Sequence, residues 1–155
     1  MVCSVYLDGS KYTQPMSRRT IAIAAALSVL ALGAPLIIAN ANPLADNLFN
    51  SGVDKYYQGD YQGAIADYTM AIEINPQDVG AYTNRGIAKN GLKDYQGAIA
   101  DYNKALEINP KDPIAYSNRG ASKELLGDLK GACDDWRKAV DLGDERSAEW
   151  VKNQC

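Results

Sequence analysis

Residues 42–155 carry apolar and small side chains at the spacing of short amphipathic helices. One stretch places such residues three and four positions apart: Tyr95, Ala98, Ile99, Tyr102, Ala105 and Leu106. This spacing is the apolar stripe that one face of an α-helix buries. Asn109-Pro110 follows the stretch and ends the helix, because the residue before proline is disfavoured in the helical region. Gly91 interrupts the preceding helical stretch. The pattern predicts pairs of short helices and an all-α fold.

The chain repeats itself at an offset of 34 residues. The nine residues 60–68 return unchanged as 94–102, and Glu-Ile-Asn-Pro at 73–76 returns at 107–110. A weaker third copy runs through Gly120, Gly131, Ala132, Trp136 and Ala139. A fixed period of this size predicts a repeat architecture, in which each unit buries its apolar face against its neighbours.

These residues resemble the tetratricopeptide repeat (TPR), whose framework combines aromatic, small and proline positions. The second copy matches that framework with Tyr82, Gly86, Ala98, Tyr102, Ala105 and Pro110. The first copy departs only at its first position, with Leu48, Gly52, Ala64, Tyr68, Ala71 and Pro76. The third has Tyr116, Gly120, Ala132, Trp136 and Ala139, with Asp144 in place of proline. The resemblance implies an α-solenoid of three helix-turn-helix units at about 45–78, 79–112 and 113–146.

The third copy is followed by a segment that predicts a capping helix over 145–154. Gly143 is expected to end the last repeat helix, and Asp144 to cap the next one at its N-terminus. We expect Ala148, Trp150 and Val151 to cover the third unit.

The first forty residues have the composition of a secretory signal peptide. Arg18-Arg19 precede an uncharged apolar run over 21–32, and Ala39-Asn40-Ala41 supplies the small residues of a cleavage site. We therefore expect a signal peptide helix over 16–41, with 1–15 as an upstream extension or misassigned start. The mature TPR domain is then 42–155, exported to a periplasm or equivalent lumen. The alternative is an uncleaved membrane anchor over 21–39.

The charge balance and the absence of histidine narrow the possible functions. Sixteen basic and nineteen acidic residues give a net charge of −3, which does not favour nucleic acid or an anionic membrane. Without histidine the chain lacks the usual general base, the commonest nitrogen ligand for zinc, and any Ser-His or Cys-His nucleophile. We expect no enzyme, no cofactor, no metal and no small-molecule substrate.

The resemblance implies a partner-binding groove on the concave face, lined by the first helix of each unit. Carried over by position, its residues are Phe49, Asn50, Val53, Tyr56, Tyr57, Thr83, Asn84, Ile87, Asn90, Ser117, Asn118 and Ala121. Asn50, Asn84 and Asn118 form a column in which each amide offers a donor and an acceptor to a peptide backbone. The alternative is that these amides brace neighbouring helices.

The Tyr-x-Asn-Arg-Gly segments at 82–86 and 116–120 look like part of the carboxylate clamp of heat-shock co-chaperones. The clamp's cations are absent, because the matching positions hold Phe49, Val53, Ile114 and Asn118. We therefore do not expect capture of a C-terminal carboxylate as the main mode.

Two columns of charged residues accompany the repeat. We interpret Arg85 and Arg119 as ion-pair partners, of Asp101 and of Asp134-Asp135, with direct ligand contact as the alternative. Asp67, Asp101 and Asp135 are expected on a solvated face of the second helices.

Two cysteines remain after cleavage. In an oxidising compartment Cys133 and Cys155 are expected to pair, which would stabilise the fold by about 3 kcal/mol in the chain-entropy model. The alternative is a buried free Cys133 beside a frayed C-terminus.

The sequence predicts an exported, non-enzymatic interaction module that binds a partner peptide or protein segment in its groove, with a scaffold or assembly role. The alternative is a structural, self-associating component of a larger envelope complex without a defined peptide ligand.

Overall fold

The computed structural model describes residues 5–7, 10–12 and 42–155, in two units that are considered separately. In the first unit, β1 (Val5–Leu7) and β2 (Ser10–Tyr12) pair antiparallel, with Val5 opposite Tyr12 and Leu7 opposite Ser10. This hairpin falls within the predicted upstream extension. The predicted signal peptide and the alternative anchor lie outside the described residues. Among the helices that the structure does describe, none has the length and apolar character needed to span a membrane.

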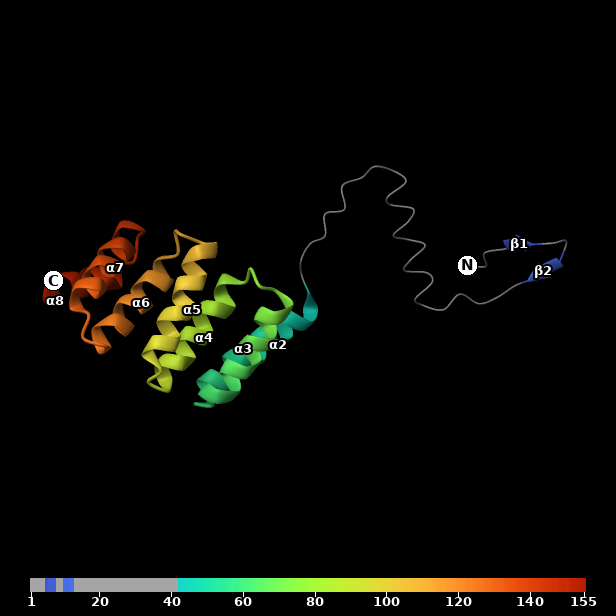
Figure 1. Ribbon diagram of the computed structural model, residues 1–155, viewed down its shortest axis with the longest axis horizontal. Coiled ribbons are helices and arrows are strands. Elements are labelled where there is room, and N and C mark those ends of the chain that lie inside the picture. The colour runs from blue at the N-terminus through green and yellow to red at the C-terminus, as the bar shows by residue number, and fades with distance from the viewer. Residues whose placement is uncertain (1–4, 8–9, 13–41) are drawn as a thin grey trace. The chain divides into compact units, whose positions relative to one another are not determined.

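The second unit, from residue 42 onward, consists of seven helices and confirms the predicted all-α solenoid. They are α2 (Pro43–Tyr57), α3 (Tyr61–Ile74), α4 (Val79–Gly91), α5 (Tyr95–Ile108), α6 (Pro113–Leu125), α7 (Leu129–Asp141) and α8 (Glu145–Gln154). Each helix packs against the next along the chain, and α4 also contacts both α2 and α6 (Figure 1). Three helix pairs therefore stack in succession, with α8 against α7.

An aspartate begins the second helix of every pair. The side chains of Asp60, Asp94 and Asp128 each accept a hydrogen bond from a backbone N–H three residues on, at 2.9, 3.0 and 2.9 Å. The donors belong to Gly63, Gly97 and Gly131. A Cβ at these glycines would lie only 2.1 or 2.2 Å from the second oxygen, Oδ2, of the capping carboxylate. The repeated Asp-x-x-Gly motif is thus a helix cap that favours glycine three residues after the aspartate.

Small residues let the two helices of each pair approach closely. Ala64, Ala98 and Ala132 are completely buried. A Cβ at Gly86 would lie 2.6 Å from the Tyr102 ring, and the first and third pairs repeat this contact with Tyr68 and Trp136. Because the large ring occupies the space that a side chain would need, glycine is required there.

The capping helix is held by contacts that only partly match the expectation. Gly143 adopts a φ of 97°, as expected of a residue that ends a helix. Ser147 is fully buried, donates to Asp144 Oδ2 at 2.7 Å and has its Oγ 3.1 Å from Ser117 Oγ, whereas Ala148 is exposed. The expectation for Ala148 is therefore wrong, because Ser147, three and four residues before Trp150 and Val151, is the residue that shares their face of α8.

Trp150 and Cys155 supply the other contacts of α8 with the third repeat. The Trp150 ring lies 5.5 Å from the Trp136 ring, and a disulfide joins Cys133 to Cys155. This is the disulfide pairing that the sequence predicts.

Candidate functional site

A hollow of about 260 Å³ opens between the first and second repeats. Its lining comes from three helices: Val53, Tyr56 and Tyr57 from α2, Tyr68 from α3, and Asn84 and Ile87 from α4. Five of these six are predicted groove residues. The sixth, Tyr68, is missed because its framework position assigns it to the core, where the structure also finds it, with 1% of its surface exposed.

Aromatic rings dominate the wall of this hollow. The Tyr56 ring lies 5.7 Å from Tyr57, edge-on, and 5.4 Å from Tyr61. Tyr57 is 82% exposed, so its ring is free to contact a ligand. Burial, followed by the neighbouring phenols, raises the pKa of Tyr56 and raises the pKa of Tyr68 to about 12. Both hydroxyls therefore stay neutral at physiological pH.

Four other predicted groove residues are either buried or hydrogen-bonded within the protein. Thr83 and Ser117 are only 5% and 3% exposed, which corrects the expectation that they face an open groove. Asn90 Nδ2 donates to Tyr102 Oη at 3.2 Å and to Ser122 Oγ at 2.9 Å. Asn118 Nδ2 donates to the carbonyl of Ile114, one turn earlier in its own helix, at 3.0 Å.

The three remaining predicted residues differ in exposure. Phe49 is half-buried, with its ring 5.7 Å from that of Tyr68, and Ala121 is also half-buried. Asn50 is exposed on α2. The column of three free amides is thus not formed as expected, because Asn118 makes an intrahelical bond while Asn84 lines the hollow.

Asp67, Asp101 and Asp135 are buried, which corrects the expectation of a solvated face. Their exposed fractions are 4%, 3% and 5%. The Arg85 guanidinium donates to both carboxylate oxygens of Asp101, at 2.9 and 2.7 Å, and Lys89 Nζ lies 2.8 Å from the same carboxylate. Such paired, bidentate contacts are what make a buried carboxylate tolerable.

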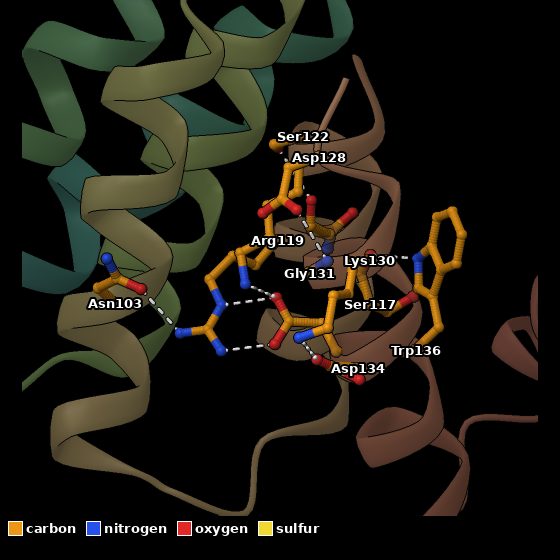
Figure 2. Close-up of polar contacts among 12 residues, drawn as sticks. Asn103, Ser117, Arg119, Ser122, Asp128, Lys130, Gly131, Asp134 and Trp136 are labelled. Carbon is orange, nitrogen blue, oxygen red and sulfur yellow. Dashed lines mark hydrogen bonds and ion pairs between the residues drawn. The ribbon is translucent and has the colours of Figure 1, made fainter. Parts of the chain in front are cut away.

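The third repeat copies this arrangement. Arg119 donates to both oxygens of Asp135 at 2.9 and 2.6 Å, and Lys123 Nζ lies 2.8 Å from one of them. Figure 2 shows the other side of the Arg119 guanidinium directed at Asn103 of α5, where Nη1 donates at 2.7 Å. Arg85 makes the equivalent bond to Thr69 of α3 at 3.1 Å. Each arginine therefore joins its own repeat to the preceding one.

The first repeat uses a lysine and a serine instead of the arginine. Lys55 Nζ lies 2.7 Å from Asp67 and Ser51 Oγ donates to it at 2.5 Å. Partial burial alone would raise the pKa of Asp67, but these two hydrogen bonds hold the pKa below its ordinary value.

These contacts account for every lysine and arginine on α2, α4 and α6. Arg85 and Arg119 are structural ion-pair partners, one of the two interpretations that the sequence allows. In the part of the chain from residue 42 on, no cation of these three helices is left for a ligand carboxylate. Within the described ranges, no three acidic or cysteine side chains lie close enough together to hold a metal ion.

Comparison with known proteins agrees with this architecture. A family model described as TPR repeat matches residues 52–91 and 92–127. A search of curated proteins found no match.

Three solved structures illustrate the similarity. The first TPR domain of human RPAP3 is 30% identical, with a TM-score of 0.68 over 70% of this chain and 87% of that one. The first TPR of Spaghetti (RPAP3) bound to the HSP90 peptide SRMEEVD is 29% identical, with a TM-score of 0.69 over 71% and 89%. The Sgt2 TPR domain from Aspergillus fumigatus is 25% identical, with a TM-score of 0.70 over 73% and 78%. With its repeated helix pairs, glycine–aromatic contacts and matching family model, this chain belongs to the tetratricopeptide repeat family.

Proposed function

We propose that this chain is a non-enzymatic interaction module that binds an extended segment of a partner protein across α2, α4 and α6. The observation that carries the proposal is the hollow between the first two repeats. It combines an exposed tyrosine, Tyr57, with a polar group, Asn84, that makes no hydrogen bond to another residue of the described ranges. A concave, mainly apolar site with a few polar groups is the usual form of a binding pocket.

The solved relatives support a peptide ligand. One of them, the first TPR of Spaghetti (RPAP3), is bound to an HSP90 peptide that ends in Glu-Glu-Val-Asp. In this chain the positions that match the carboxylate clamp hold uncharged residues, and the cations of α2, α4 and α6 are paired with aspartates. The partner is therefore bound through side chains and backbone within a segment rather than through a terminal carboxylate.

The proposed setting is an exported compartment, in which the module has a scaffold or assembly role. Two features favour this setting: the signal-like composition of 16–41 and the Cys133–Cys155 disulfide. Mass spectrometry of the mature protein tests it, with an N-terminus at Asn42 as the expected result. A mature chain that still contains residues 16–41 would contradict the proposed cleavage.

Site-specific photo-crosslinking in the source cells tests the binding site. A crosslinking amino acid at Ile87 in the hollow is expected to capture a partner protein, and the same group at Lys130, which is highly exposed on α7, serves as the control. Substitution of Asn84 by Ala is expected to weaken the capture at Ile87. Equal capture from both positions would contradict a groove site, and capture of a second copy alone would favour the self-associating alternative.

A further inference from the structure

The first repeat carries nearly all of the net charge of the solenoid. Residues 43–76 contain one basic and five acidic residues, a net charge of −4. Residues 77–110 contain four of each sign and are neutral. The one basic residue of the first repeat, Lys55, is already paired with Asp67. Of the other acidic side chains, Asp46, Asp54 and Asp60 are exposed, and none has an ion-pair partner among residues 42–155.

The hollow borders this negatively charged repeat and is lined by groups that favour a cation. The faces of Tyr56 and Tyr57 carry the negative lobe of the ring quadrupole, which attracts ammonium and guanidinium groups. The Tyr68 hydroxyl and the Asn84 carbonyl oxygen are hydrogen-bond acceptors at the same wall. No lysine or arginine belongs to the lining.

The size of the hollow points to a side chain rather than to a free small molecule. Its volume of about 260 Å³ lies below the usual range of small-molecule pockets. It is also open to the groove face, because Tyr57 at its edge is 82% exposed. A long side chain can therefore enter it from a segment that lies on α2 and α4.

From the rings, the acceptors and the local charge, we propose that the hollow binds a lysine or arginine side chain, so that the partner of this module presents a basic segment. The inference rests on the proposed function and names the chemistry of its ligand. An apolar side chain would fit the rings equally well, but it would leave the acceptors unused and gain nothing from the net charge of −4. Because the negative charge of the first repeat would attract the basic segment, we also expect added salt to weaken binding.

A matched pair of peptides tests the inference on the full chain. The probes are acetyl-Ala-Ile-Arg-Ile-Ala-amide and the same peptide with citrulline, which has the shape of arginine without its charge. In an NMR titration, we expect the arginine peptide to shift the Tyr56, Tyr57 and Asn84 side-chain signals. The citrulline peptide should bind about tenfold more weakly, as expected for loss of a cation at an aromatic site.

Variants at one exposed position in two repeats complete the test. Tyr57→Ala should weaken the arginine peptide about three- to tenfold, because it removes one ring of the hollow. Leu125→Ala is the matched control, since Leu125 occupies the same position in the third repeat and is 58% exposed. It should leave the affinity unchanged. Neither change removes a buried side chain, so both variants are expected to fold.

Two results would overturn the inference. Equal affinity for the arginine and citrulline peptides would show that the hollow recognises shape and not charge. Shifts that avoid the hollow, or no shifts with either peptide, would remove the cation site. Neither result decides the proposed function, which is judged by crosslinking of the partner at Ile87.

Discussion

The junction between the first and second repeats is open, whereas the junction between the second and third is closed by an additional asparagine bridge. An arginine bond crosses both, from Arg85 to Thr69 and from Arg119 to Asn103. At the closed junction, Asn90 bridges Tyr102 of its own repeat to Ser122 of the next, with bonds of 3.2 and 2.9 Å. The corresponding residues at the open junction are Tyr56 and Ala88, which cannot form this bridge. The two junctions share the aromatic and small residues of the TPR framework. Residues outside that framework decide whether a junction is bridged by hydrogen bonds or contains a hollow.

A second difference lies at the mouth of each junction. Tyr57 of the first repeat corresponds to Gly91 of the second, so only the first junction has a ring at its edge. The contacts of the buried aspartates also differ between the repeats. Asp101 is held by a bidentate arginine that also reaches the preceding repeat, whereas Asp67 is held by Lys55 and Ser51. The first repeat has no preceding repeat to reach, and an arginine bond crosses both junctions, so the junctions themselves differ in the Asn90 bridge and in the ring of Tyr57.

The largest expected effect is a difference in stability between variants of the two buried aspartates, Asp101 and Asp67. Asp101→Asn should lower the free energy of unfolding by about 3 kcal/mol, because it leaves Arg85 and Lys89 without their shared, desolvated partner. Asp67→Asn should cost about 1 kcal/mol, since its partners are a more exposed lysine and a serine. Urea unfolding measures both, with exposed Asp134→Asn as the control. If both variants lose the same unfolding free energy, the ion pairs of the first and second repeats do not differ in strength.

Removal of the disulfide tests whether the open junction is independent of the C-terminal end. The Cys133→Ala/Cys155→Ala double variant should lose about 3 kcal/mol of stability, the loop-closure contribution of a loop of this length. Binding at the hollow should be unchanged, because α8 packs on α7 at the other end of the solenoid (Figure 1). Thermal unfolding and a peptide titration of the same sample measure the two effects. A large change in affinity would show that the two ends are coupled.

The closed junction is tested by Asn90→Ala. The change leaves the Tyr102 hydroxyl without its donor and removes the hydrogen bonding between Asn90 and Ser122, so we expect a loss of about 1–2 kcal/mol in unfolding free energy. The matched control is Asn50→Ala, which removes an exposed amide from α2 and should change stability by less than about 0.5 kcal/mol. If the two variants lose the same stability, the bridge does not seal the junction.

The smallest effect concerns the turn between the two helices of each repeat. Lys93 adopts a left-handed φ of 63°, where the first and third repeats have Gly59 and Gly127 at 82° and 85°. Lys93→Gly should therefore raise the stability by about 1 kcal/mol, because only glycine adopts this region without steric cost. Gly127→Ala should lower it by a similar amount, since an added Cβ there meets no atom within 4 Å and only the backbone is strained. A loss on Lys93→Gly would contradict the argument.

The sequence by itself determined the repeat, the helix pairs and the glycine–aromatic contacts. These follow from local rules: helical spacing, aspartate caps, breaks at proline and glycine, and a period that recurs in three copies. It also indicated five of the six residues that line the hollow, and the pairing of Cys133 with Cys155.

Only the tertiary structure decided which polar groups are buried and which are free. Asp101 and Asp135 have the sequence context of a solvated helix face, yet the arginine of the facing helix encloses each of them. Likewise, Asn84 and Asn90 are both predicted for the groove, and only the packing against α6 ties Asn90 into the closed junction. The physical reason is that burial depends on what the neighbouring helix places opposite a side chain, and helical spacing within one segment carries no information about that neighbour.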